Sequence, residues 1–387
     1  MASPFLNLGR CRVFAQEPPA KPFEVSTRAV DLVLGSTVID MLGLLTFDWP
    51  KLALWQTQPL TFGEREFRQL ESSGITIFHP AVDPAAKNPY QAALRWIDRW
   101  NTLLKNQGCF FTRIDSINDL LLVPKIGTLG VMIGFQNGDH FRRVSDVAAF
   151  HRLGQRVSQL TYNTTNALGS GCYEPRDGGL TRFGAAVVQE MNRVGMVVDI
   201  SHCGERTSLE AIGHSSKPVL VTHSNCKALV PGHPRCKSDN VIRVMAAGGG
   251  VMGITLVRAF VSRSRSPTIG HVLDHFDHVA RVSGIEHVGL GSDVDVTAID
   301  PATGRINPFY DIRGLDPVGR VFQLTDGLLA RGYSDADVKL VLGGNFLRAL
   351  TSIFPSDSWQ VSPSREVRRD PFCPAPNRHS PLPVVEG

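Results

Sequence analysis

Two histidines stand at the ends of short apolar runs, where they could bind one metal ion together. His202 follows the Val- and Ile-rich run 196–200, and His223 follows the run 218–222. Such runs are typical of buried parallel strands, whose carboxyl ends carry ligands and catalytic groups in α/β proteins. Residues 205–215 predict a helix between them, so the strands are expected to be neighbours. Two adjacent imidazoles can share a metal, although a hydrogen-bonded structural role is the alternative for each.

Other predicted strands bring further polar side chains to the same rim. Asp293 could complete a metal site or act as general base, and Gln136 could add a neutral amide oxygen. Arg235, in the loop after the sixth predicted strand, suits a substrate carboxylate or phosphate. A surface arginine is the equal alternative. The other expected rim residues are Asp40, His79 and Tyr162.

Eight strand-like runs alternate with helices and predict the fold class. The runs are 36–40, 74–79, 130–137, 156–163, 195–202, 218–223, 250–256 and 286–293. This order is typical of an α/β protein with a (β/α)₈ TIM barrel. A doubly wound sheet is the competitor, but no Gly-rich phosphate-binding fingerprint follows a strand in the required form. The expected domains are an irregular tail (1–25), the barrel (26–352) and a Pro-rich tail (353–387).

Composition narrows the classes of partner and compartment. The 387 residues include 40 Lys and Arg against 36 Asp and Glu, so no nucleic-acid surface is expected. No window approaches 18 uninterrupted apolar residues, which argues against a membrane span. The first 16 residues make a poor secretory signal. Seven irregularly spaced cysteines indicate free thiols in a reducing compartment, and the location is predicted to be cytoplasmic.

Two other groups of potential ligands are interpreted as structural. His271, His275 and His278 have helical spacing on the predicted helix 269–283, and a solvated helix face is favoured over metal binding. Cys203 and Cys226 lie beside or near the two strand-end histidines. Small buried residues are favoured over thiolate ligands there.

Several motifs together resemble one known family, the membrane (renal) dipeptidases. These are zinc-dependent (β/α)₈ hydrolases related to the amidohydrolases. The resemblance covers roughly residues 36–352 and rests on these motifs: Gly179-Leu-Thr-Arg-Phe-Gly184, Met191-Asn-Arg-Val-Gly195, Asp199-Ile-Ser-His202, Thr222-His-Ser224, Gly289-Leu-Gly-Ser-Asp293 and Gly343-Gly-Asn-Phe346.

The resemblance implies roles for individual residues. By this resemblance, His202 and His223 are ligands of one zinc, and His223 is also a catalytic residue. Asp293 corresponds to the aspartate that follows the eighth strand in the family. Arg235 is implied to bind the substrate carboxylate. The implied substrate is a dipeptide or a related carboxylate-bearing amide. The family often forms dimers, so a homodimer is an option. The apolar stretch 41–49 is its one candidate interface and fits a core equally well.

The sequence departs from the family where the second zinc binds. The family's first strand continues Asp-Gly-His-Asn-Asp, but here the ligand positions are Leu42 and Leu44. The bridging glutamate falls on Gln136, and a substrate-contacting histidine falls on Tyr162. We therefore expect one zinc or other divalent metal per chain, held by His202, His223, Gln136 and Asp293.

The remaining site predictions concern the substrate. Tyr162, Asn163 and His79 are expected to contact it, together with Arg235. Three hypotheses follow. The first is a mononuclear metal-dependent hydrolase. The second is a metal-free acid–base enzyme such as an isomerase, tautomerase or lyase. The third is a non-catalytic ligand-binding protein on the same scaffold.

Overall fold

A closed ring of parallel strands forms the centre of the protein. The computed structural model describes residues 10–13, 23–84 and 86–355. The ring consists of β3 (Ile39–Asp40), β5 (Ile77–Phe78) continued by β6 (Ala81–Val82), β8 (Leu129–Val131) continued by β9 (Ile133–Phe135), β10 (Gln155–Gln159), β11 (Val197–Asp199), β12 (Val221–Ser224), β13 (Met252–Ile254) and β14 (Val288–Leu290).

Each strand of the ring pairs in parallel with the next. Parallel pairing joins consecutive strands from β3 to β11 and from β12 to β14, with register shifts in the β9–β10 and β12–β13 pairs. A single bridge from Asp199 to Leu220 joins β11 to β12. Leu290 of β14 pairs with Asp40 of β3 and closes the ring. The predicted (β/α)₈ barrel is confirmed.

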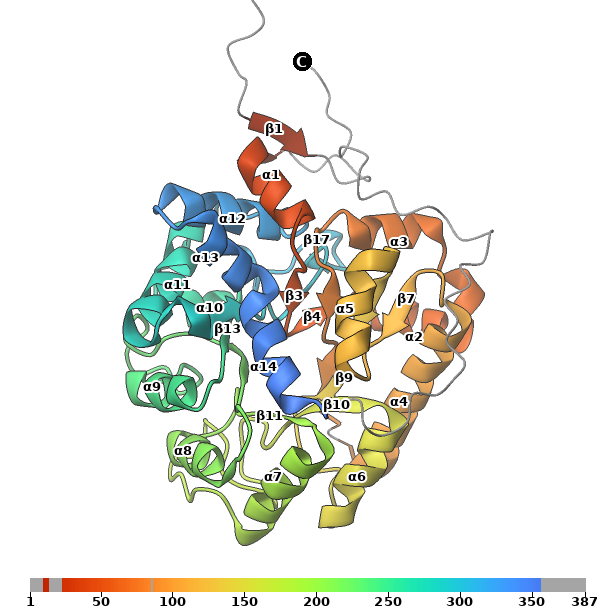
Figure 1. The fold of residues 1–387 in the computed structure, drawn as a ribbon, viewed down its shortest axis with the longest axis vertical. Helices are drawn as coiled ribbons and strands as arrows, with labels where there is room; N and C mark the ends of the chain where they lie inside the picture. Colours follow the sequence, from red (N-terminus) through yellow and green to blue (C-terminus); the bar gives the residue numbers. More distant parts are fainter. Residues whose placement is uncertain (1–9, 14–22, 85, 356–387) are drawn as a thin grey trace, which may run out of the picture.

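Helices surround the strands (Figure 1). They are α1 (Thr27–Leu34), α2 (Trp49–Thr57), α3 (Glu64–Glu71), α4 (Pro89–Asn106), α5 (Ile117–Ile126), α6 (Val144–Leu153), α7 (Arg182–Val194), α8 (Glu205–His214), α9 (Asp239–Ala247), α10 (Arg258–Val261), α11 (Ile269–Ser283), α12 (Arg320–Ala330), α13 (Asp335–Lys339) and α14 (Asn345–Ile353). Apolar residues of the strands and of the inward helix faces make the core. Burial on both faces explains why these strands are continuous apolar runs.

Several elements were missing from the prediction, among them two helices and a strand near the ring. Helix α2 begins where the Asp48 side chain accepts from the Lys51 amide, with a proline in its first turn. Helix α5 has a capping box at Ser116 and ends at Gly127, although Pro124 lies inside it. The extra strand β7 (Phe111–Arg113) pairs with β8. The strand is only three residues long. In the two helices the apolar residues are spread around the axis, so their caps carry most of the information.

The stretch 41–49 belongs mainly to the core. Met41, Leu42, Leu44 and Leu45 are all at most 5% exposed, whereas Trp49 is largely exposed. The core interpretation of this stretch is therefore confirmed for its first half, and those residues are not available to a dimer interface.

The histidines of α11 do not form a solvated face. His275 and His278 are buried. The His275 ring bonds to the Cys226 amide and the Val261 carbonyl, and His278 bonds to Asp239. The predicted exposure is wrong for these two residues, whereas His271 is partly exposed and contacts Thr268 at the start of the helix.

The cysteines differ partly from the prediction. Those at positions 172, 203, 226 and 236 are free thiols, as expected. Cys109 is disulfide-bonded, so the prediction of free thiols is wrong for this residue. Disulfides are typical of oxidising compartments. The cytoplasmic location therefore stays a prediction without full support from the cysteines.

The chain ends lie mostly outside the described residues. Strands β1 (Arg10–Val13) and β2 (Phe23–Ser26) pair antiparallel, within or at the edge of the segment predicted to be an irregular tail. Residues 1–9, 14–22 and 356–387, which include most of the predicted C-terminal tail, are not described.

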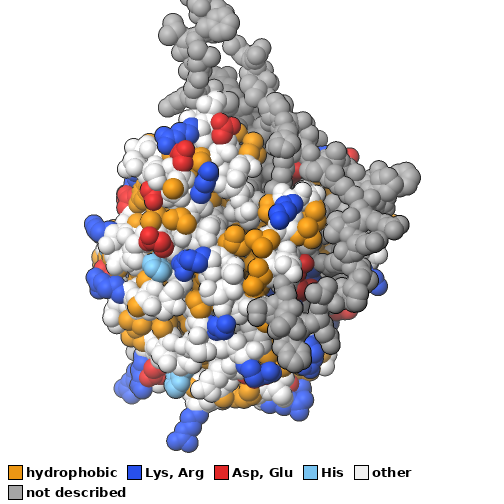
Figure 2. All heavy atoms as spheres, viewed as in Figure 1, with side chains coloured by type: hydrophobic (Ala, Val, Ile, Leu, Met, Phe, Trp, Pro, Cys, Tyr) orange, Lys and Arg blue, Asp and Glu red, His pale blue; other side chains and the backbone are white. Residues whose placement is uncertain are grey.

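The surface of the protein carries charges of both signs. Lys and Arg side chains are interspersed with Asp and Glu side chains on the face of the molecule that Figure 2 shows. Among the helices of the described ranges, none has the length and apolar composition needed to cross a membrane.

A buried histidine among three phenylalanine rings predicts acid sensitivity. His140 packs against Phe135, Phe141 and Phe150 and bonds to Gln155. Burial lowers its pKa from 6.5 to about 4. Between these values the unfolded chain binds a proton that the native state excludes, so stability falls as pH drops through this window. One such group costs about 3 kcal/mol at pH 4.

Urea denaturation at pH 7 and pH 4 measures this dependence. We expect His140→Phe to reduce the stability lost between the two pH values, whatever its effect at pH 7. An unchanged loss would show that other groups account for the acid sensitivity.

Candidate active site

The two strand-end histidines meet at the mouth of the barrel. His202 follows β11 and His223 lies in β12, and the bridge between these strands brings their ends together. The two Nε2 atoms are 3.1 Å apart. Both side chains are buried. The predicted pairing of these imidazoles is confirmed.

The second nitrogen of His202 is held from a loop. Its Nδ1 lies 2.8 Å from the Oδ1 atom of Asn163. A carbonyl oxygen only accepts, so Nδ1 carries the proton and Nε2 carries a lone pair. Tyr162 stacks on the same ring, with centroids 4.2 Å apart. Thus Tyr162 and Asn163, two of the four residues expected to contact substrate, both contact His202.

The second nitrogen of His223 is held by a chain of side chains. The Thr222 hydroxyl donates to Asp199 at 2.6 Å, and the Ser201 hydroxyl donates to the other oxygen of Asp199 at 2.6 Å. Because a hydroxyl has one proton, Thr222 can only accept from His223 Nδ1, which lies 2.9 Å away. His223 therefore also presents a lone pair at Nε2.

Two lone pairs consequently face each other across 3.1 Å. Burial, and then the nearby Arg235 guanidinium, lowers the pKa of both imidazoles, which keeps them neutral. Neutral imidazoles whose other nitrogens donate to fixed oxygens are the form that binds divalent metals. These two residues fit two ligands of one metal ion.

Arg235 lies behind the histidines. It is 1% exposed, so the surface interpretation is wrong. Its Nη1 donates to the Ser201 carbonyl and its Nη2 to the His223 carbonyl, at 2.5 and 2.8 Å. Among the described residues its Nε has no partner. Binding of a substrate carboxylate by Arg235 stays a prediction.

Asp293 and Gln136 do not complete a ligand cluster. Within the described part of the chain, no three His, Cys, Asp or Glu side chains are grouped to hold a metal ion. Asp293 is half-buried with a left-handed φ of 59°, and its amide donates to the Leu42 carbonyl. Burial raises the pKa of its carboxyl to about 7, although the positive charge of Arg235 acts to lower it. The Gln136 amide donates to the Ala81 carbonyl.

His79 is as fully buried as the two site histidines. It is 1% exposed, and its Nδ1 is 2.5 Å from the Met41 carbonyl. Its Nε2 has no partner among the described residues, and burial lowers its pKa. Contact with a substrate would require movement of the residues around it.

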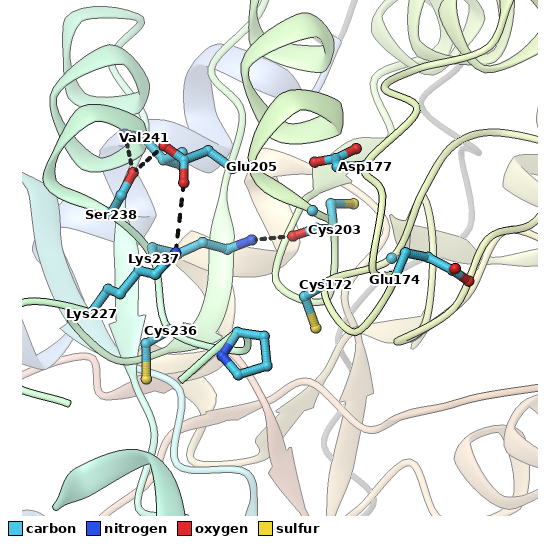
Figure 3. Close-up of a pocket in the computed structure, with 13 residues that line it drawn as sticks. Cys172, Glu174, Asp177, Cys203, Glu205, Lys227, Cys236, Lys237, Ser238 and Val241 are labelled. Carbon is cyan, nitrogen blue, oxygen red and sulfur yellow. Dashed lines mark hydrogen bonds and ion pairs between the residues drawn. The ribbon is translucent and has the colours of Figure 1, made fainter. Parts of the chain in front are cut away.

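A separate cavity of about 130 Å³ lies among the loops that follow β10, β11 and β12. Cys172, Cys203 and Cys236 line it, and the Lys237 ammonium reaches the Cys203 carbonyl at 2.8 Å (Figure 3). Burial raises the pKa of Cys203 to about 11 and also raises that of Cys226. The interpretation of Cys203 and Cys226 as small buried residues is confirmed.

A parallel (β/α)₈ barrel with histidines at its strand ends is the architecture of amidohydrolase-like proteins. The family model of membrane dipeptidase, peptidase family M19, matches residues 67–356. The chain therefore belongs to the membrane dipeptidase family and is a hydrolase.

Curated relatives support this assignment. The chain is 33% identical to dipeptidase verJ of Clonostachys rogersoniana, over 71% of this chain and 70% of the relative. It is 35% identical to dipeptidase aclJ of Aspergillus oryzae, over 53% of this chain and 46% of the relative. The second match thus spans less than half of that protein's length.

Solved structures share the fold. An amidohydrolase from Pseudomonas aeruginosa is 29% identical with a TM-score of 0.70, and the match covers 84% of this chain and 99% of the other. A metallopeptidase from Rhodobacter sphaeroides, liganded with a phosphinate mimic of the dipeptide L-Ala-D-Ala, has a TM-score of 0.67 at 19% identity. That match covers 82% and 99% of the two chains.

Sequence reasoning missed the residues that orient the histidines. Asp199, Ser201 and Thr222 all lie in quoted motifs, but no side-chain role was assigned to them. A Ser or Thr directly before each histidine was the available indication. For Asn163 the predicted role was substrate contact, whereas the structure shows a bond to His202.

Proposed function

We propose that this protein hydrolyses a dipeptide or a related carboxylate-bearing amide with one divalent metal ion, zinc being the first candidate. The observation that carries the proposal is the approach of His202 Nε2 to His223 Nε2, 3.1 Å apart, with the other ring nitrogen of each histidine held by an oxygen atom. A shared cation relieves their mutual repulsion. When bound, such a metal acts as a Lewis acid that polarises a carbonyl and acidifies water.

A second metal is not supported by the residues at the family's other ligand positions. Leu42 and Leu44 are buried apolar side chains, 0% and 5% exposed. Gln136 is neutral, and its amide is bonded to the β6 backbone. Two divalent cations need several charged or imidazole ligands. Apolar side chains and one neutral amide cannot replace them.

The chain itself supplies a proton carrier. With a pKa raised to about 7 by burial, Asp293 can accept and return a proton near neutral pH, which suits a general base and acid. Its carboxylate has no hydrogen bond within the described residues, so it is free to bond to substrate or water. Tyr162, stacked on His202, forms an aromatic wall beside the pair.

The metal-free acid–base enzyme is the second candidate. The observation favouring it is that the described residues group no third ligand with the two histidines. Asp293, with its raised pKa, would then be the proton carrier of an isomerase, tautomerase or lyase.

Turnover of a dipeptide panel tests the proposal. We expect zinc-loaded protein to cleave at least one dipeptide, chelation to stop this, and Asp293→Asn to slow it about 10²–10⁴-fold by removing the proton carrier. Asp311→Asn is the matched control, since Asp311 is an exposed aspartate in the same loop. Turnover that survives chelation would favour the metal-free enzyme. A lack of turnover on every dipeptide would refute the proposal.

A further inference from the structure

Among the residues that the structure describes, a single side chain fixes the tautomer of His202. Asn163 Oδ1 is the hydrogen-bond partner of its Nδ1, at 2.8 Å. The stacked Tyr162 ring restrains the plane of the imidazole but makes no hydrogen bond to it. A neutral imidazole has one proton to place, so the acceptor at Nδ1 decides that Nε2 faces His223 with a lone pair.

The backbone of Asn163 is held in a rare conformation. Its φ is 63°, in the left-handed region that few residues other than Gly and Asn adopt. Its carbonyl accepts from the Tyr173 amide at 2.9 Å. Gly171 packs so closely that a Cβ there would collide with the Asn163 backbone. The loop after β10 thus holds Asn163 rigidly, with its side chain toward His202.

The two histidines differ in how they are held. The acceptor for His223 is its own neighbour, Thr222, which β12 and Asp199 keep in place. The acceptor for His202 lies 39 residues away in a different loop. Loss of Asn163 therefore leaves His202 free to exchange tautomers, while His223 is unaffected.

We propose that Asn163 is a positioning residue that sets the Nδ1–H tautomer of His202 and so prepares the pair to bind one cation. Its predicted contact with substrate stays a separate prediction. The consequence for metal binding rests on the proposed function, whereas the tautomer does not, because it is a property of the metal-free protein.

Nitrogen-15 NMR of the histidine rings tests the tautomer in metal-free protein, since ring nitrogens with a proton and with a lone pair resonate separately. Asn163→Gly is the informative variant, because glycine adopts the same φ without strain. We expect its His202 to populate both tautomers. Zinc alone, titrated against a chelating dye, should bind about 10–100-fold more weakly, as when other outer-shell partners are removed.

Two further variants sharpen the test. Asn163→Asp retains an acceptor at Oδ1 and should restore both the tautomer and zinc binding. Thr164→Ala changes the exposed neighbour and should alter neither. An unchanged His202 tautomer in Asn163→Gly would overturn the inference. If the wild type binds no zinc while Asn163→Gly still changes the tautomer, the proposed function fails and the positioning role stands.

Discussion

Replacing Arg320 by methionine is expected to lower the free energy of unfolding by about 3–5 kcal/mol. Arg320 and Asp40 are both 0% exposed and form an ion pair, with Nη2 and Oδ2 3.4 Å apart. Arg320 also donates to the carbonyls of Asp295 and Pro317. Methionine fills similar space but leaves the Asp40 carboxylate buried without its cation. The effect is a large part of the roughly 5–15 kcal/mol that stabilises a typical domain.

The solvent-exposed ion pairs of Arg331 provide a matched control. Arg331 forms ion pairs with Asp274 and Asp277, whose side chains are about half exposed. Solvent screens such pairs, so Arg331→Met should cost at most about 1 kcal/mol. Urea denaturation measures both variants. Equal losses would show that the buried pair does not stabilise the barrel in the way described.

Replacing His223 by alanine is expected to abolish zinc binding and hydrolysis together. The change removes one of the two Nε2 donors that face each other. One remaining imidazole cannot hold a divalent ion against water, so affinity should fall by more than the roughly 100-fold cost of outer-shell changes. Zinc titration and dipeptide turnover measure the two effects.

His214→Ala is the control for this variant. His214 ends α8, lies between the two site histidines in the chain and is exposed. It should bind zinc and turn over substrate like the wild type. Zinc affinity retained by His223→Ala would mean that the imidazole pair is not the metal site, and turnover retained without zinc would favour the metal-free alternative.

The barrel could be predicted because its strands are buried on both faces. Runs such as 196–200 and 218–222 are continuously apolar for this reason, and polarity changes where each strand ends. The missing elements have a different origin. Helix α5 contains Pro124, which argues against a helix locally, and its capping box and tertiary contacts outweigh that penalty.

The site was only partly predictable, because burial of polar groups depends on the assembled fold. The pairing of His202 with His223 follows from two neighbouring strand ends. Arg235 gave no sign that backbone carbonyls would hold it in the interior. The role of Asn163 depends on a left-handed backbone and on Gly171, which sequence spacing does not reveal.

The most direct test of one metal per chain is the metal content of protein purified without a metal-affinity tag or chelator. Inductively coupled plasma mass spectrometry counts all candidate ions at once. We expect about one divalent ion per chain, because His202 and His223 offer two facing ligand nitrogens while Leu42 and Leu44 offer none. Two ions per chain, or none, would contradict it.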